Sequence, residues 1–201
     1  MCSVREYPVA ARPVSTNGLA LTSPACACSH LDAALYEFDR ALQMVTSEDL
    51  DCDTSIPGVT VRALVNHVVM GNSLAVFLLD GACRDAAQNA VCKDLLGSDH
   101  YAAWRESATA QSASFRRSGA DTAKCEHPHA DLAGSELREY RTVDLVLHTS
   151  DLWAARGTQW RCPIGLFGVL VSSRALMRRL VEPSALSRLD NLVGLGPNPG
   201  G

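Results

Sequence analysis

Residues 142–148 read TVDLVLH, and this run is the most informative stretch of the chain. Its apolar residues are typical of a helix that packs against other helices, and they flank two polar ones, Asp144 and His148. The four-residue spacing puts both side chains on one helix face, with Cβ atoms about 5–6 Å apart. A carboxylate and an imidazole on a packed face need partners, and a divalent metal is one of them.

Outward from this run, apolar residues recur at helical spacing along most of the chain. Ser29 is a predicted N-cap, Thr60 is a second, and Ser135 is a third that precedes the helix with Asp144. Residues 118–130 read as a loop, and we find no convincing strand pair. The pattern predicts an all-α bundle with helices over about residues 29–45, 61–80, 84–96, 99–117, 135–157 and 163–181.

A chain of 201 residues is long enough for one domain with a full core. Residues 1–28 lack periodicity and carry several prolines, so we predict a flexible N-terminal extension. Residues 29–201 then form the helical bundle domain. Because aromatic residues make up only 5% of the chain, aliphatic side chains must fill most of its interior.

The net charge is −4, which argues against a nucleic-acid or anionic-membrane surface. The longest apolar run, residues 74–79, is too short to span a bilayer, and no secretory signal is visible at the N-terminus. We therefore expect a cytoplasmic protein with a small-molecule substrate and neither nucleic acid nor membrane as a partner.

The chain holds eight cysteines, and reduced thiols are expected without an export signal. Two clusters place metal-ligand residue types at alternate positions, as an extended segment presents them. They are Cys26, Cys28 and His30, and Cys125, His127 and His129. Neither has a standard zinc spacing, so a loop is the favoured interpretation of both.

A bundle-core metal takes its ligands from facing helices, and His67 lies in a predicted helix that is apolar almost all round. His67, Asp144 and His148 would supply three ligands and leave the open position of a catalytic zinc site. Metal-free alternatives stay open for each residue. His67 would be a hydrogen-bonded core histidine, Asp144 would pair with Arg141, and His148 would bond Asp144.

Asp151 lies one turn beyond His148, where it either orients that imidazole or balances the charge of Arg156. Trp153 and Trp160 would line a substrate pocket or pack near a helix end. A metal-free cluster of His67, Asp144 and His148 with Asp151 would still suit general acid–base catalysis.

Three stretches resemble a known family. Residues 58–69, GVTVRALVNHVV, are similar to the "PGWTVRDLVNHVV" stretch of DinB-like proteins, in the branch of the mycothiol-dependent maleylpyruvate isomerase metal-binding domain. Residues 144–157, DLVLHTSDLWAARG, resemble its "DxLxHTWDLARATG" stretch, and residues 184–194, SALSRLDNLVG, resemble its C-terminal "SPLDRLLALLG".

The resemblance implies a DinB-like four-helix bundle, with additional short helices here, that binds a divalent metal, zinc or nickel. The isomerase ligands are His, a carboxylate and His, which fall on His67, Asp144 and His148. Family members with known activity use a low-molecular-weight thiol, mycothiol or bacillithiol, as cosubstrate for isomerisation or S-transfer.

The chain also departs from the family pattern around these residues. Val59 and Ser150 replace two tryptophans, Ala154 replaces an arginine, and Asp144 is shorter than the glutamate of the isomerase. The three ligand types persist while the pocket around them differs, so the fold transfers and a specific reaction does not.

We therefore expect a metal-dependent, thiol-linked transferase or isomerase that acts on a small organic electrophile. One alternative is a metal-free enzyme of specialised metabolism that uses acid–base residues for cyclisation, elimination or isomerisation. Another is a non-enzymatic stress-response or ligand-binding bundle, with a homodimer through exposed helix faces left open.

Overall fold

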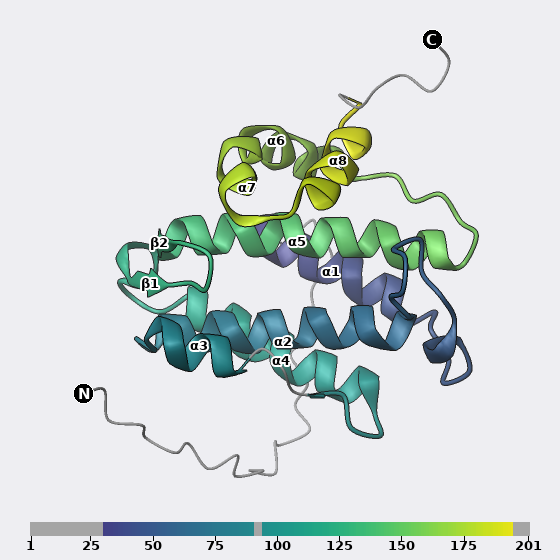
Figure 1. The fold of residues 1–201 in the computed structure, drawn as a ribbon, viewed down its shortest axis with the longest axis horizontal. Coiled ribbons are helices and arrows are strands. Elements are labelled where there is room, and N and C mark those ends of the chain that lie inside the picture. The colour runs from purple at the N-terminus through teal and green to yellow at the C-terminus, as the bar shows by residue number, and fades with distance from the viewer. Residues whose placement is uncertain (1–29, 91–93, 195–201) are drawn as a thin grey trace.

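The computed structural model describes residues 30–90 and 94–194. Four long helices form a bundle in which each helix packs on two others (Figure 1). The order around the bundle is α1–α5–α2–α4. This arrangement confirms the all-α prediction. The four helices are α1 (His30–Leu42), α2 (Val61–Leu79), α4 (His100–Phe115) and α5 (Gly134–Ala155).

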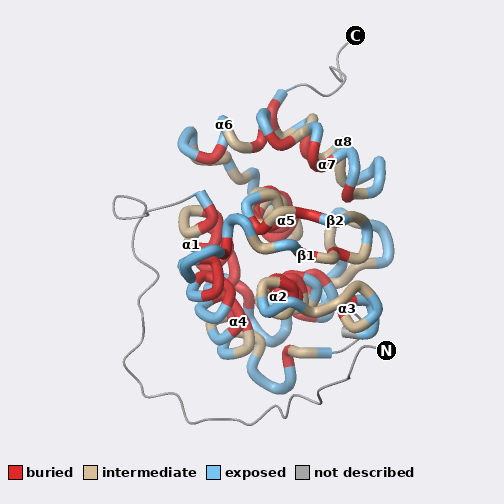
Figure 2. The backbone as a smooth tube through the Cα atoms, turned by 90° about the vertical axis from the view of Figure 1, so that its left-hand side faces the viewer, coloured by how far each residue is buried: buried red, intermediate tan, exposed pale blue. Residues whose placement is uncertain are grey.

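Three shorter C-terminal helices form a separate layer over α5 (Figures 1 and 2). They are α6 (Ile164–Ser172), α7 (Arg174–Leu180) and α8 (Pro183–Leu192). The expectation of one continuous helix over residues 163–181 is wrong, because the chain breaks at Ser173. The Ser173 hydroxyl donates to the carbonyl of Val169 and contacts Glu139 of α5, a local bond that competes with a straight helix.

Aliphatic side chains fill the bundle, and buried residues gather on the facing sides of its helices (Figure 2). The main aromatic contact joins Phe38 and Trp104, whose ring centroids lie 4.6 Å apart. Trp104 donates its indole N–H to Asp39 at 2.9 Å, which satisfies the polar atom of a fully buried ring. Helix α2 alone among the described helices is long and apolar enough to cross a membrane, and half of that apolar window is buried inside the bundle.

Side-chain caps begin two of the long helices; the cap at Thr60 was predicted and the cap at Asp99 was not. Thr60 accepts a hydrogen bond from the Ala63 amide, and Asp99 caps α4 in the same way. The predicted cap at Ser135 is wrong, because α5 begins at Gly134 after Ala133. A methyl group at Gly134 would collide with the backbone carbonyl of Ala120, so the close approach requires glycine there.

A small β-hairpin lies between α4 and α5, where the sequence predicts only a loop. Strand β1 (Lys124–Glu126) pairs antiparallel with β2 (Asp131–Ala133), with Cys125 opposite Leu132. Strands of three residues are too short to show an alternating pattern, which explains the error. The remaining short elements are α3 (Arg84–Ala90), which ends earlier than the predicted residue 96, and the 3-10 helices η2 (Asp49–Asp51) and η3 (Ala120–Thr122).

The predicted N-terminal extension, residues 1–28, lies outside the described residues. So do the proposed cap Ser29 and the cysteines Cys26 and Cys28. The bundle domain is therefore described from His30 onward.

Candidate metal centre

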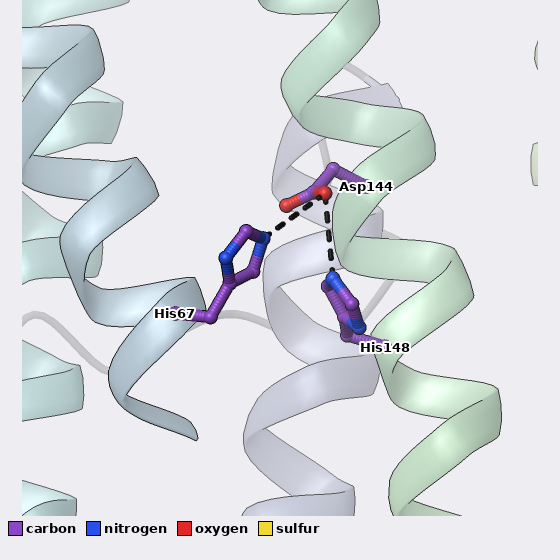
Figure 3. Close-up of side chains that lie close together, drawn as sticks. All are labelled: His67, Asp144 and His148. Carbon is purple, nitrogen blue, oxygen red and sulfur yellow. Dashed lines mark ion pairs between the residues drawn. The ribbon is translucent and has the colours of Figure 1, made fainter. Parts of the chain in front are cut away.

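Helices α2 and α5 bring His67, Asp144 and His148 together, although His67 lies far from the other two in the sequence. Figure 3 shows the His67 imidazole reaching from α2 toward the Asp144 and His148 side chains on α5. The Asp144 Oδ1 atom lies 3.6 Å from His67 Nε2 and 3.4 Å from His148 Nε2. The three potential ligand atoms all lie within 4.8 Å of one another.

The second carboxylate oxygen of Asp144 is bound by Arg141. The Arg141 guanidinium donates to Asp144 Oδ2 at 2.6 Å, so the predicted ion pair is present. Arg141 also donates to Gln111 and to Asn72, and its side chain is 3% exposed. This network fixes the carboxylate and leaves Oδ1 directed at the two imidazoles. The ion pair and a metal site are therefore compatible.

The second ring nitrogen of His148 is bound by Asp151. His148 Nδ1 lies 3.1 Å from Asp151 Oδ2, and Arg188 of α8 donates to the same oxygen at 2.5 Å. The alternative pairing of Asp151 with Arg156 is wrong, since Arg156 bonds Asp49 instead. Because a carboxylate is only an acceptor, Nδ1 carries the proton and Nε2 of the neutral ring holds a lone pair.

The carboxylates around His148 raise its pKa by more than burial lowers it. Burial by itself would lower the pKa of His148, but the charge of Asp144 and hydrogen bonds to Asp144 and Asp151 raise it to about 9. Burial would raise the pKa of Asp144, yet His148, Arg141 and the hydrogen bonds from both imidazoles hold it well below the usual value. Without a metal, the described groups thus form a carboxylate–imidazolium pair.

The donor set fits a divalent cation. A lone pair on neutral His148 Nε2 faces the charged Oδ1 of Asp144, and this arrangement needs either an extra proton or a cation between the two atoms. Ligands about 2.0–2.1 Å from a tetrahedral zinc lie about 3.3 Å from one another, close to the two separations that involve Asp144 Oδ1, and all three ligand atoms lie within 4.8 Å of one another. The partners on Oδ2 and Nδ1 orient these ligands as outer hydrogen bonds commonly do.

His67 is the accessible member of the cluster. Its side chain is 47% exposed, so the alternative of a buried core histidine is wrong. His67 lines a cavity of about 450 Å³ between α2, α5, α3 and the hairpin turn. A larger cavity of about 830 Å³ lies between α1, α5 and α6, and none of the three cluster residues lines it.

The other sequence candidates are not members of the cluster. Trp160 donates to Glu37 and borders a cavity next to Asp151, whereas Trp153 packs against the hydrophobic core. The Cys125 side chain is buried on β1, and His127 and His129 follow it in the hairpin turn. Among the described residues, only His67, Asp144 and His148 form a group of three that could hold a metal ion.

Two supporting residues were not predicted from the sequence. Arg188 reaches Asp151 from a separate helix, and no local spacing indicates that contact; the only signal is its position within the family-like stretch 184–194. Gly71 lies beside Arg141, where a methyl group would collide with the guanidinium. A glycine inside an apolar helix was the available signal for such a close approach.

Comparison with protein families identifies the family of the chain. The model of the mycothiol maleylpyruvate isomerase N-terminal domain matches residues 31–153, more than half of the chain. The chain belongs to this family. The matched segment of this mycothiol isomerase family member contains His67, Asp144, His148 and Asp151 and ends near the end of α5, so α6–α8 lie beyond it. No curated protein and no solved structure matches the chain.

Proposed function

We propose that the protein is a metal-dependent transferase or isomerase that uses a low-molecular-weight thiol of the mycothiol type on a small organic electrophile. His67, Asp144 and His148 hold zinc or nickel, and Asp151 keeps His148 in the ligating tautomer. The observation that carries the proposal is the convergence of His67 Nε2, Asp144 Oδ1 and His148 Nε2. Membership of the mycothiol isomerase family supports the thiol.

The chemistry follows from the donor set. When bound, a divalent cation lowers the pKa of a coordinated thiol or water and so provides a nucleophile at neutral pH. Arg141 and Arg188 hold the two carboxylates in place, and His67 borders the cavity through which small molecules reach the cluster. Because Arg141 lies beneath Asp144 with almost no exposure, it acts as a positioning residue.

Metal analysis tests the metal-binding part of the proposal. The purified protein should contain about one equivalent of zinc or nickel, and His148→Ala should lose it. Asp151→Asn should retain metal with about 10–100-fold weaker affinity, because it disturbs only the support of His148. His129→Ala is the matched control, as it removes an exposed histidine outside the cluster. Well-folded protein that takes up neither metal refutes the metal site.

A turnover assay tests the reaction class. Metal-loaded protein should react mycothiol with small enones or alkyl halides to form thioethers, which consumes the thiol, or should convert cis enones to their trans isomers, which returns the thiol, and the metal-free protein should do neither. Thiol consumption at the same rate in His148→Ala would contradict the assignment. Metal uptake without any turnover across the panel would favour a binding protein over an enzyme.

A second candidate is a metal-free acid–base enzyme that promotes cyclisation, elimination or isomerisation. The observation that favours it is the Asp144–His148 pair, which is self-sufficient when His148 is protonated and has its pKa raised to about 9. Activity that survives a strong chelator and is lost in Asp144→Asn would establish this candidate. We propose a cytoplasmic location and a small-molecule partner for either reaction.

A further inference from the structure

The cavity of about 830 Å³ between α1, α5 and α6 takes no part in the proposed metal chemistry, because none of the three proposed ligands lines it. The start of α1 forms one of its walls, and α6 forms another. Figure 2 shows the start of α1 beneath α6. His30 is the first residue that the structure describes, and it lines this cavity. The chain before residue 30 is therefore attached at the cavity itself.

Helix α6 is apolar on its outer side as well as on its inner side. Leu166 is buried against the bundle, whereas Ile164, Phe167 and Val171 are 93%, 40% and 42% exposed. They are three of the four exposed large hydrophobic residues in the described part of the chain, and helical spacing puts them on one stripe. A methyl group at Gly168 would meet no described atom within 4 Å. An apolar face left open in this way is typical of an interaction site.

Two carboxylates lie between the bundle and the layer that contains α6. Glu37 of α1 accepts a hydrogen bond at 3.2 Å from the indole of Trp160, which precedes α6. Glu139 of α5 accepts one from the hydroxyl of Ser173, which follows α6. Both glutamates line the cavity. The space beneath α6 is thus bordered by acidic groups near both ends of the helix.

The described lining of this cavity has no free lysine or arginine. Arg138 is the one such residue there, and it forms an ion pair with Asp121. Arg40 pairs with Glu37 at 3.3 Å, but Arg40 does not line the cavity and solvent screens its exposed guanidinium. The cavity and the neighbouring α6 face therefore suit an apolar segment with a positive charge.

Residues 9–21 of the same chain, VAARPVSTNGLAL, have this composition. They include valines, alanines and two leucines, Leu19 and Leu21, and their single charged residue is Arg12. Leu21 is nine residues before His30, a length that spans at most about 30 Å when extended. Because His30 lines the cavity, residues 9–21 are close enough in the chain to reach it.

We propose that residues 9–21 bind to the exposed face of α6 and to the cavity beneath it, with the two leucines on the apolar stripe and Arg12 near the glutamates. Attachment at His30 gives the segment a high effective concentration, so weak contacts are enough. A second copy of the chain fits less well, since a twofold interface would bring each acidic cavity close to its own copy. The inference goes beyond the proposed function and is independent of the metal.

Photocross-linking in the 201-residue chain tests the proposal. The photoreactive amino acid p-benzoylphenylalanine replaces Ile164, which lines the cavity and is exposed. After irradiation, digestion and mass spectrometry of the monomer should locate the cross-link within residues 9–21. The same amino acid in place of Met44 is the matched control, because Met44 is 51% exposed and follows the opposite end of α1. This control should give no cross-link to residues 9–21.

Substitutions in the segment separate binding from tethering. Leu19→Asp combined with Leu21→Asp puts charges on the apolar contacts and should lower the cross-linked fraction by about tenfold or more. Arg12→Glu adds a negative charge next to two carboxylates and should lower it about two- to fivefold. Arg5→Glu, outside residues 9–21, should leave it unchanged. Circular dichroism checks that the bundle, which none of these substitutions alters, stays folded.

Four outcomes would overturn the proposal. A cross-link confined to residues 22–29 would reflect only their position next to His30 in the chain. A cross-link between two chains would identify a second copy as the occupant of the α6 face. The absence of any cross-link to residues 9–21 would refute the contact directly. An undiminished cross-link in the leucine variant would show that the apolar residues do not bind α6.

Discussion

His148 and His127 are both almost inaccessible to solvent, at 8% and 3% exposure, yet their neighbours drive them toward opposite protonation states. The carboxylates beside His148 raise its pKa to about 9 against the effect of burial. His127 has no carboxylate partner among the described residues, so burial and nearby positive charges lower its pKa to about 4. Burial favours the neutral ring in both cases, and the partner decides the outcome.

The difference originates in local backbone structure. On α5, helical spacing puts Asp144 one turn before His148 and Asp151 one turn after it. In the hairpin turn, His127 receives a backbone N–H from two residues later. The same residue type is thus prepared to bind a cation in one place and is kept neutral in the other.

The largest effect is expected from removal of the Arg141 guanidinium, which binds Asp144 of the proposed metal cluster. Arg141→Met leaves Asp144, Asn72 and Gln111 without their partner and should lower the free energy of unfolding by about 3–5 kcal/mol. Urea denaturation of metal-free protein measures the change. The matched substitution on the hairpin side, Arg84→Met, should lower it by about 1–2 kcal/mol, because Arg84 is partly exposed. A larger loss of unfolding free energy in Arg84→Met than in Arg141→Met would show that the hairpin contacts contribute more to stability than those of Arg141.

A pH series should separate the two imidazoles. The pKa of His127 falls from 6.5 to about 4 on folding, so the unfolded chain binds a proton first as the solution is acidified. His127 therefore contributes stability that is fully present above pH 6.5 and is lost as pH falls toward 4, by up to about 3 kcal/mol. The difference in unfolding free energy between the natural protein and His127→Phe should follow this curve. A difference that does not change with pH would contradict the neutral assignment.

Two glycine substitutions compare a crowded position with an open one. The methyl group of Gly71→Ala collides with the Arg141 guanidinium and should destabilise the protein by about 2 kcal/mol. Gly168→Ala, on the exposed part of α6, meets nothing within 4 Å and should stabilise the protein by about 0.5–1 kcal/mol. Thermal unfolding measures both. If both substitutions stabilised the protein equally, the higher helix propensity of alanine would outweigh the collision with Arg141.

The last prediction concerns competition between protons and metal at His148. The raised pKa of about 9 means that zinc must displace a proton from Nε2 at neutral pH. Zinc affinity should therefore rise about tenfold per pH unit between neutral pH and the pKa of His148, as a competing chelator can measure. The dependence of zinc affinity on pH should be unchanged in His127→Phe, because the imidazole that this substitution removes is already neutral in this pH range. A flat profile for the natural protein would contradict the protonated state of His148.

The long helices could be predicted because their apolar spacing repeats over several turns and their caps carry side-chain oxygens, as at Thr60 and Asp99. The Asp144–His148 pair could be predicted for the same reason, and the family resemblance indicated His67 as its partner. The hairpin could not, since three-residue strands leave no period to detect. The start of α5 was also missed, because Ala133 has no capping oxygen and a close contact between Gly134 and Ala120 selects the glycine.

The contact between Arg188 and Asp151 connects the outer helical layer with the interior of the bundle. Arg188 lies on α8, beyond the segment that the family model matches, and is not one of the proposed ligands. Substitutions along α8 can therefore change how firmly one imidazole is held while every residue around the ion stays the same. Related proteins with identical ligands but different C-terminal helices would then differ in metal retention, and sequence differences in α8 would account for it.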